Sequence, residues 1–175
     1  MTERVVRVAL LVWRPVDPGA PGDVARGWPR MLLTRDVRSP WQLPAVVLRP
    51  AEAVMGAAGR VAYALGLELP KAHRVLAVEQ HPPGPTGGEQ LTLVVDGGWV
   101  AGAEVAVGEH AAFLCPHDCQ HHSRWAGVDE VETDGTLVAA IGAAVGKFPA
   151  FVVGQEGQEG QEEQEGQGDA GAPVG

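Results

Sequence analysis

The sequence predicts a mixed α/β domain, and three observations lead to that prediction. Apolar, β-branched runs typical of strands occur at residues 5–14, 73–80 and 90–95. Residues 51–66 and 136–147 carry aliphatic side chains three and four positions apart, which is the spacing of a helix with one apolar face. Strands and helices do not alternate strictly, so the order is not that of a parallel doubly wound sheet.

The first elements follow from local signals. Residues 5–14 (VVRVALLVWR) are predicted to form a strand, and residues 16–27 a loop, because proline, glycine and aspartate recur there. A second, short strand is predicted at 31–35 (MLLTR). The segment 41–48 (WQLPAVVL) comes next and is stopped by Pro50.

A helix is predicted over residues 51–66. Val54, Val61 and Leu65 recur on one face, and Gly66 suits the left-handed position that often ends a helix.

The second half is predicted to continue with strands and then a helix. Strands are expected at 73–80 and 90–95, and the sequence Asp96-Gly97-Gly98 predicts a turn after them. Residues 101–123 are predicted to be less regular. The final helix is expected at 136–147, where Leu and Ile alternate with Ala on one side.

Charge separates a balanced body from an acidic tail. The chain has 175 residues and a net charge of −9, and residues 154–175 contain six of its 22 acidic residues and no base. The body, residues 1–153, then carries about −3, which gives no electrostatic footprint for nucleic acid. The Gln/Glu/Gly-rich tail is predicted to be disordered and to act as a solubilising extension rather than a partner-binding segment. A cytoplasmic protein without membrane contact is expected, because no apolar run is long enough to span a bilayer.

The segment 41–67 resembles the Nudix box and its lead-in. That family's box is G-x5-E-x7-R-E-U-x-E-E-x-G-U, where U is a bulky aliphatic residue, and Leu-Pro-Gly usually precedes it. Here Leu43-Pro44 matches the lead-in, Glu52 matches the first glutamate, and Arg60 follows at the box spacing. The closing Gly66-Leu67 comes one residue early.

The resemblance extends over about residues 4–148 and carries three implications. It implies the Nudix α/β/α sandwich, with a mixed central sheet between the box helix and the C-terminal helix. It implies hydrolysis of a nucleoside diphosphate linked to another group, with Mg²⁺ or Mn²⁺ held by box glutamates. It also implies a small nucleotide-like ligand as partner.

The chain departs from the box at the residues that would hold the metal. Val61 stands where the family has the glutamate after the arginine, and the two downstream glutamates fall on Ala64 and Leu65, or within residues 62–65 if the missing residue is placed differently. No acid lies between Glu52 and Glu68. Aliphatic side chains cannot ligate Mg²⁺, which requires oxygen ligands. The metal is therefore expected to be lost, and the first hypothesis is a weak or inactive enzyme that at most binds a nucleotide-like diphosphate.

The surviving box residues and one outside carboxylate are the candidate catalytic residues. Glu52 and Arg60 are eight positions apart on the predicted helix and can pair, so a structural ion pair is weighed above metal or phosphate binding. Glu79, near His81, is a candidate replacement carboxylate, although a solvated side chain is the simpler interpretation. An active Mg²⁺-dependent hydrolase using Glu52 and Glu79 is the second hypothesis.

A cluster of cysteine and histidine supports a third hypothesis. Cys115, His117, Cys119 and His121 alternate, so they would share one face of an extended strand. These are ligand types that zinc accepts, but the separated pairs of an established zinc motif are missing. A zinc-binding interaction module is therefore kept as an alternative, beside a polar loop with two incidental cysteines.

The tryptophans near loops are candidates for stacking on a base. Trp28, Trp41 and Trp99 are each predicted to pack in the core or a loop, with ligand stacking as the alternative.

Overall fold

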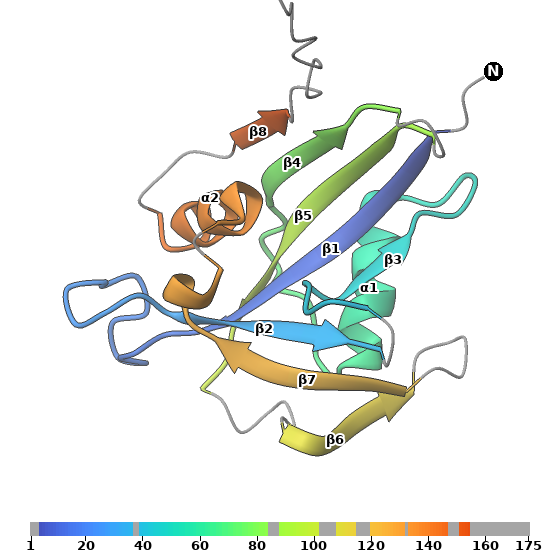
Figure 1. Ribbon diagram of the computed structural model, residues 1–175. Helices are drawn as coiled ribbons and strands as arrows, with labels where there is room; N and C mark the ends of the chain where they lie inside the picture. Colours follow the sequence, from blue (N-terminus) through green and yellow to red (C-terminus); the bar gives the residue numbers. More distant parts are fainter. Residues whose placement is uncertain are drawn as a thin grey trace, which may run out of the picture.

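The computed structural model describes residues 4–36, 39–83, 88–101, 108–114, 120–131, 133–146 and 151–154. Its elements, in chain order, are β1 (Val5–Arg14), β2 (Arg30–Arg35), β3 (Ala45–Val47), α1 (Val54–Ala64), β4 (Val75–His81), β5 (Gln90–Trp99), β6 (Gly108–Leu114), β7 (Gln120–Ala126), a short 3₁₀ helix (Val128–Glu130), α2 (Gly135–Ala144) and β8 (Phe151–Gly154) (Figure 1). Gly154, the first residue of the predicted tail, ends β8, whereas residues 155–175 lie outside the described residues, so their predicted disorder stays a prediction.

The strands form one mixed sheet around β1. Within the described residues the strand order is β6-β7-β2-β1-β5-β4-β8, and β3 pairs with β1 beside β2. β1 runs parallel to β5 and antiparallel to β2 and β3. β2 and β3 pair with the same edge of β1. β2 pairs with its C-terminal end, where Trp13 is opposite Met31, and β3 pairs nearer its N-terminal end, where Ala9 is opposite Ala45.

Each face of the sheet carries one helix, which makes an α/β/α sandwich (Figure 1). Alternate residues of β1 show the two layers, because successive side chains of a strand point to opposite faces. Val8, Leu10 and Val12 are fully buried in the cluster that packs against α1. Ala9 and Leu11 belong to the cluster that contains α2. The mixed sandwich predicted from the sequence is confirmed.

The helix α1 begins later than the sequence predicted. Ala51 has a φ of 61° and Ala53 is extended, so the chain makes a loop after Pro50 and turns helical at Val54. The predicted end is confirmed, since Gly66 follows the helix with a φ of 71°. None of the helices among the described residues is long and apolar enough to cross a membrane.

The turn predicted at residues 96–98 is wrong. The strand β5 continues to Trp99, and its pairing with β1 shifts register between Leu11 and Trp13. Two glycines make this bulge possible. A side chain at Gly97 would have its Cβ 2.8 Å from Leu10 Cγ, and Gly98 has a φ of 80°. The glycine pair thus bends a strand and does not reverse it.

The irregular structure predicted for residues 101–123 is also wrong in part. β6 and β7 pair antiparallel in this region, and β7 pairs with β2 from Ala126 to His122. The strand β7 could not be recognised from its sequence, QHHSRWA, because polar and apolar residues do not alternate in it. It forms a strand because its backbone pairs with that of β2. The described part of α2 ends at Ala144, and Lys147 lies outside the described residues.

Candidate functional site

A cleft of about 160 Å³ lies on the α2 side of the sheet. The strands β1, β4 and β5 form its floor, the start of α2 forms one wall, and the segment before β3 forms the other. The polar residues that line it are Arg7, Gln42, Glu79, His81, Gln90, Thr92, Asp134 and Thr136, and the others are Ala9, Trp41, Leu43, Ala45, Val94 and Leu137.

The wall from α2 is held by a capping aspartate. Asp134 Oδ1 accepts hydrogen bonds from the backbone N–H groups of Thr136, at 3.0 Å, and Leu137, at 3.1 Å. These are among the first N–H groups of α2, which have no partner within the helix. The cap therefore fixes the direction in which Asp134 and Thr136 face the cleft.

The cleft contains one of the carboxylates singled out in the sequence. Glu79 and His81 alternate on β4, so both side chains are on the same face of the sheet. Glu79 Oε2 lies 3.2 Å from His81 Nε2, and both side chains are partly exposed. Glu79 thus lies in the lining of the cleft, with the ring of His81 beside its carboxylate.

The opposite wall combines a cation, an amide and a tryptophan. Arg7 donates from Nη2 to Gln42 Oε1 at 3.2 Å. The ring of Trp41, next in the chain, carries guanidinium groups near its faces: Cζ of Arg35 is 4.6 Å from the ring centroid and Cζ of Arg124 is 4.9 Å. Trp41, one of the three predicted stacking candidates, is the one that lines this cleft.

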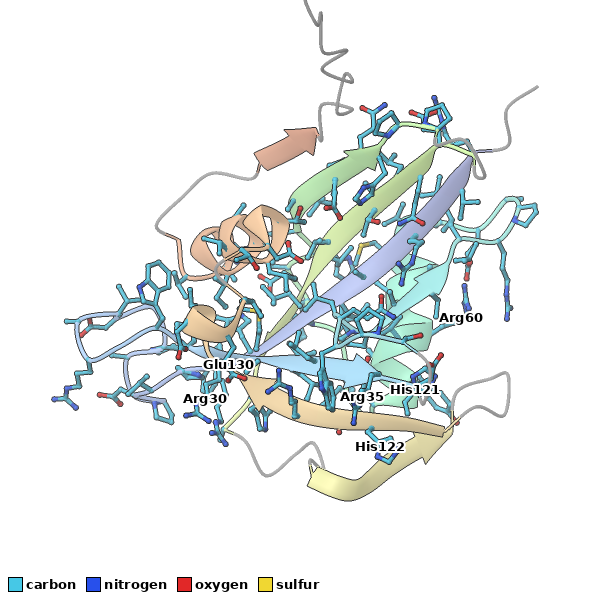
Figure 2. The ribbon with its side chains drawn as sticks, in the orientation of Figure 1. Arg30, Arg35, Arg60, His121, His122 and Glu130 are labelled. Carbon is cyan, nitrogen blue, oxygen red and sulfur yellow. The ribbon has the colours of Figure 1, made fainter. Side chains whose placement is uncertain are left out.

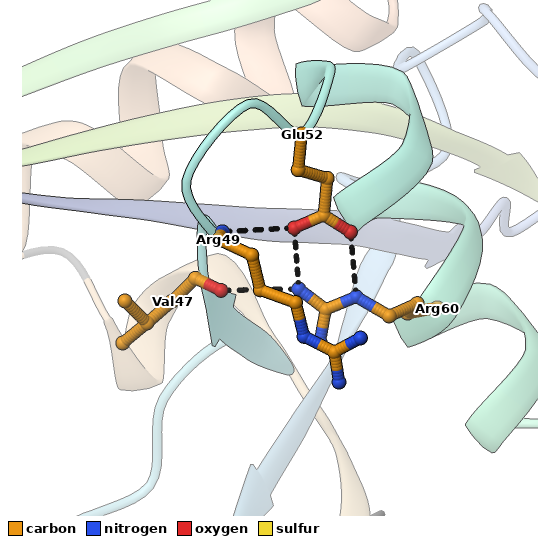
Figure 3. Close-up of polar contacts among 4 residues, drawn as sticks. All are labelled: Val47, Arg49, Glu52 and Arg60. Atoms are coloured by element: carbon orange, nitrogen blue, oxygen red, sulfur yellow. Dashed lines mark hydrogen bonds and ion pairs between the residues drawn. The ribbon is translucent and has the colours of Figure 1, made fainter.

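Glu52, just before α1, and Arg60, within α1, form an ion pair away from this cleft (Figure 3). Arg60 Nε donates to Glu52 Oε1 and Arg60 Nη2 to Glu52 Oε2, both at 2.8 Å. Arg60 Nη2 also donates to the carbonyl of Val47 at 3.0 Å, and the N–H of Arg49 donates to Glu52 Oε2 at 2.9 Å. Together these bonds tie β3 and its following loop to the helix.

This pairing determines the charge state of Glu52. The hydrogen bonds from Arg60, with that from the backbone of Arg49, lower the pKa of the Glu52 carboxyl from 4.5 to about 2. Both of its oxygens are already acceptors for donors of this chain. The structure brings Glu52 and Arg60 together and leaves Glu79 on the other face of the sheet.

The residues at the remaining box positions do not fit a divalent cation. Val61 is 4% exposed and Leu65 is 8% exposed, and both pack in the cluster beneath α1, while Ala64 is half-buried. Mg²⁺ is bound by oxygen ligands in octahedral geometry, and these side chains offer none. Among the described residues there is no group of three or more His, Cys, Asp or Glu side chains that could hold a metal.

The cysteine–histidine cluster is largely outside the described residues. Cys115, His117 and Cys119 all lie there. His121 is in β7, where its backbone pairs with that of Phe113. The zinc hypothesis therefore stays a prediction.

Solved structures of Nudix hydrolases share this fold. The MutT Nudix hydrolase of Burkholderia pseudomallei is 21% identical, with a TM-score of 0.50 over 79% of this chain and 96% of that one. The Nudix hydrolase of Nitrosomonas europaea is 15% identical, with a TM-score of 0.50 over 84% and 93%. The MutT protein of Methanosarcina mazei Go1 is 17% identical, with a TM-score of 0.50 over 77% and 85%. No family model and no curated protein matches the sequence. The chain therefore has the Nudix fold, as the sequence resemblance implied.

Several residues of the cleft were not found from the sequence. Two of them had a signal in the sequence that could have pointed to them. Arg7 is a charged residue within an apolar strand, and Asp134 precedes the second predicted helix at the position of a capping residue. The position of Thr92 had no such signal, because only the pairing of β1 with β5 brings it beside Arg7.

Proposed function

We propose that this chain is a Nudix-superfamily protein that binds a nucleotide-like diphosphate ligand in the α2-side cleft and has little or no metal-dependent hydrolase activity. The observation that carries the proposal is the set of residues at the box positions in and around the helix α1. Its remaining glutamate, Glu52, is bonded to Arg60, and aliphatic residues such as Val61 and Leu65 occupy the other positions. A divalent cation there would have to displace a guanidinium, and Val61, Ala64 and Leu65 offer it no second carboxylate.

The cleft supports a binding role. Eight of the fourteen residues that line it are polar, so the cleft offers hydrogen-bonding groups beside apolar ones to a small polar ligand. Asp134, Thr92 and Gln90 offer both hydrogen-bond acceptors and donors, as a nucleobase or ribose requires. Its volume of about 160 Å³ is smaller than the roughly 300 Å³ at which drug-sized sites begin, so it would enclose only part of a nucleotide.

Filling the cleft tests the binding role. Ala45→Phe places a ring at the cleft wall, whereas Val47→Phe adds the same ring two residues along β3 at an exposed position outside the lining. Calorimetric titration with ADP-ribose and with the four ribonucleoside diphosphates, in EDTA, should show binding by the natural protein and Val47→Phe. Ala45→Phe should lose it. Equal binding by all three proteins would place the ligand elsewhere, and no binding by the natural protein would refute the proposal.

Residual hydrolysis is the second candidate, because Glu79 lies in the cleft beside His81. Under this alternative Glu79 contributes the carboxylate that the box lacks. The natural protein would then release phosphate from a nucleoside diphosphate derivative when Mg²⁺ is added, and Glu79→Gln would abolish the release. The first proposal expects no release from either protein.

A further inference from the structure

Three groups able to carry positive charge meet on one face of the β2–β7 pair. Arg35 lies directly opposite His122, and Leu33 lies opposite Arg124. Residues opposite one another in an antiparallel pair point to the same face, as do alternate residues along each strand. Leu33 belongs to the core cluster that contains α2, so Arg35, His122 and Arg124 are on the α2 side of the sheet. Figure 2 labels Arg35 and His122 on these neighbouring strands.

Trp41 connects this cation group to the cleft. Its ring lines the cleft and is also partly buried against the α2-side core. The guanidinium groups of Arg35 and Arg124 lie near the same ring, at 4.6 and 4.9 Å from its centroid to Cζ. The cation group therefore lies next to the cleft, on the side that Trp41 lines.

Among the described residues, one ion pair balances part of the positive charge of this group. Arg124 forms an ion pair with Glu130 at 2.5 Å, and its Nε atom is buried without a hydrogen-bond partner in the described structure. Arg35 is exposed, and no ion pair to it occurs among the described residues. The guanidinium groups of Arg35 and Arg124 repel one another, and a bound anion would offset that repulsion. The arrangement thus favours an anion from outside the chain.

Stacking on Trp41 also suits these arginines for binding phosphate. A guanidinium group over an aromatic ring uses its flat face, and its N–H groups still point outward in the plane of the group. Those N–H groups can donate two parallel hydrogen bonds to a phosphate. The ring further restricts the side chain, so less conformational freedom is lost on binding.

We propose that Arg35, His122 and Arg124, arranged around Trp41, bind the phosphate groups of a ligand whose uncharged part occupies the cleft, so that protein cations take the role that a metal ion has in Nudix hydrolases. This inference rests on the proposed function and adds to it the anionic subsite. It also explains how the fold could hold a diphosphate although the helix α1 has no metal ligands, since the charge is neutralised on the other face of the sheet.

Arg35→Gln is the direct test, with Arg26→Gln as its matched control. Both arginines are exposed, and Arg26 is on the loop between β1 and β2, paired with Asp17. Calorimetric titrations in EDTA would use the four ribonucleosides and their 5′-diphosphates with each protein. Arg35→Gln should weaken diphosphate binding about tenfold, the loss of a hydrogen bond to a charged group, and leave nucleoside binding unchanged. Arg26→Gln should change neither.

Salt gives a second measurement on the same proteins. Higher ionic strength should weaken diphosphate binding by the natural protein more than by Arg35→Gln, because the variant has already lost a charge interaction. Equal diphosphate binding by Arg35→Gln and the natural protein would overturn this subsite and leave the proposed function standing. Diphosphate binding that requires Mg²⁺ would overturn both. If neither nucleosides nor diphosphates bind the natural protein, both proposals fail.

Discussion

Glu52 and Arg60 match a catalytic motif in the sequence and form an ion pair in the structure. With its oxygens bonded to Arg60 and to the N–H of Arg49, Glu52 fastens the loop between β3 and α1 (Figure 3). The sequence favoured a structural ion pair between these residues over metal or phosphate binding, and the observed hydrogen bonds are those of an ion pair that anchors a loop.

The low pKa of Glu52 predicts a pH-dependent loss of stability in Glu52→Gln. The carboxyl has a pKa of about 2 when folded and 4.5 as its ordinary value, so its ionised form stabilises the fold fully above pH 4.5. That contribution disappears as the pH falls towards 2. Urea unfolding should therefore find Glu52→Gln less stable than the natural protein at pH 7, with the difference shrinking between pH 4.5 and 2. A difference independent of pH would contradict the ion pair.

Val61 allows a test of whether the box position is part of the core. It is 4% exposed beneath α1, so Val61→Glu would bury a carboxylate without a partner. The free energy of unfolding should fall by roughly 3 kcal/mol or more. Tyr63→Glu, at a position 86% exposed on the same helix, should change it by only about 0.5 kcal/mol or less. Urea unfolding measures both changes. Similar losses in free energy of unfolding for the two variants would show that position 61 accommodates an ionised carboxylate and is not part of the packed core.

At the scale of the element, the role of one glycine could be predicted from the sequence, and the role of a glycine pair could not. Gly66 was predicted to end α1, because a left-handed residue after a helix is a local requirement. Gly97 and Gly98 were predicted to turn the chain, yet they form a bulge in β5. Turn and bulge both need flexible backbone, and the choice depends on β1, which is far away in the sequence.

The bulge predicts a specific cost for Gly97→Ala. The new Cβ would be 2.8 Å from Leu10 Cγ and 2.9 Å from both the Leu11 carbonyl oxygen and Val12 Cγ2. Such overpacking should lower the free energy of unfolding by about 1–3 kcal/mol. Gly135→Ala is the control, since a Cβ there meets nothing within 4 Å. Thermal unfolding of both variants is the measurement, and equal melting temperatures would contradict the close packing of β5 on β1.

At the scale of the whole molecule, the sandwich could be predicted because it depends on apolar periodicity, which each segment carries by itself. β1, α1 and α2 all appear near their predicted positions. The site could not be predicted in the same way. Glu79, Trp41 and Asp134 lie on β4, before β3 and before α2, and only the sheet order brings them to one cleft. The strand β7 was missed for the same reason, and with it the neighbours of Arg35.

The most direct test of the central claim is a calorimetric titration with Mg²⁺ and Mn²⁺ in the presence of ADP-ribose, with phosphate release measured in parallel. The account predicts no stoichiometric metal binding and no release, because Val61 and Leu65 replace ligands and Glu52 is already bonded to Arg60. Binding of one or more metal ions per chain, together with phosphate release, would contradict it and would direct attention to Glu79.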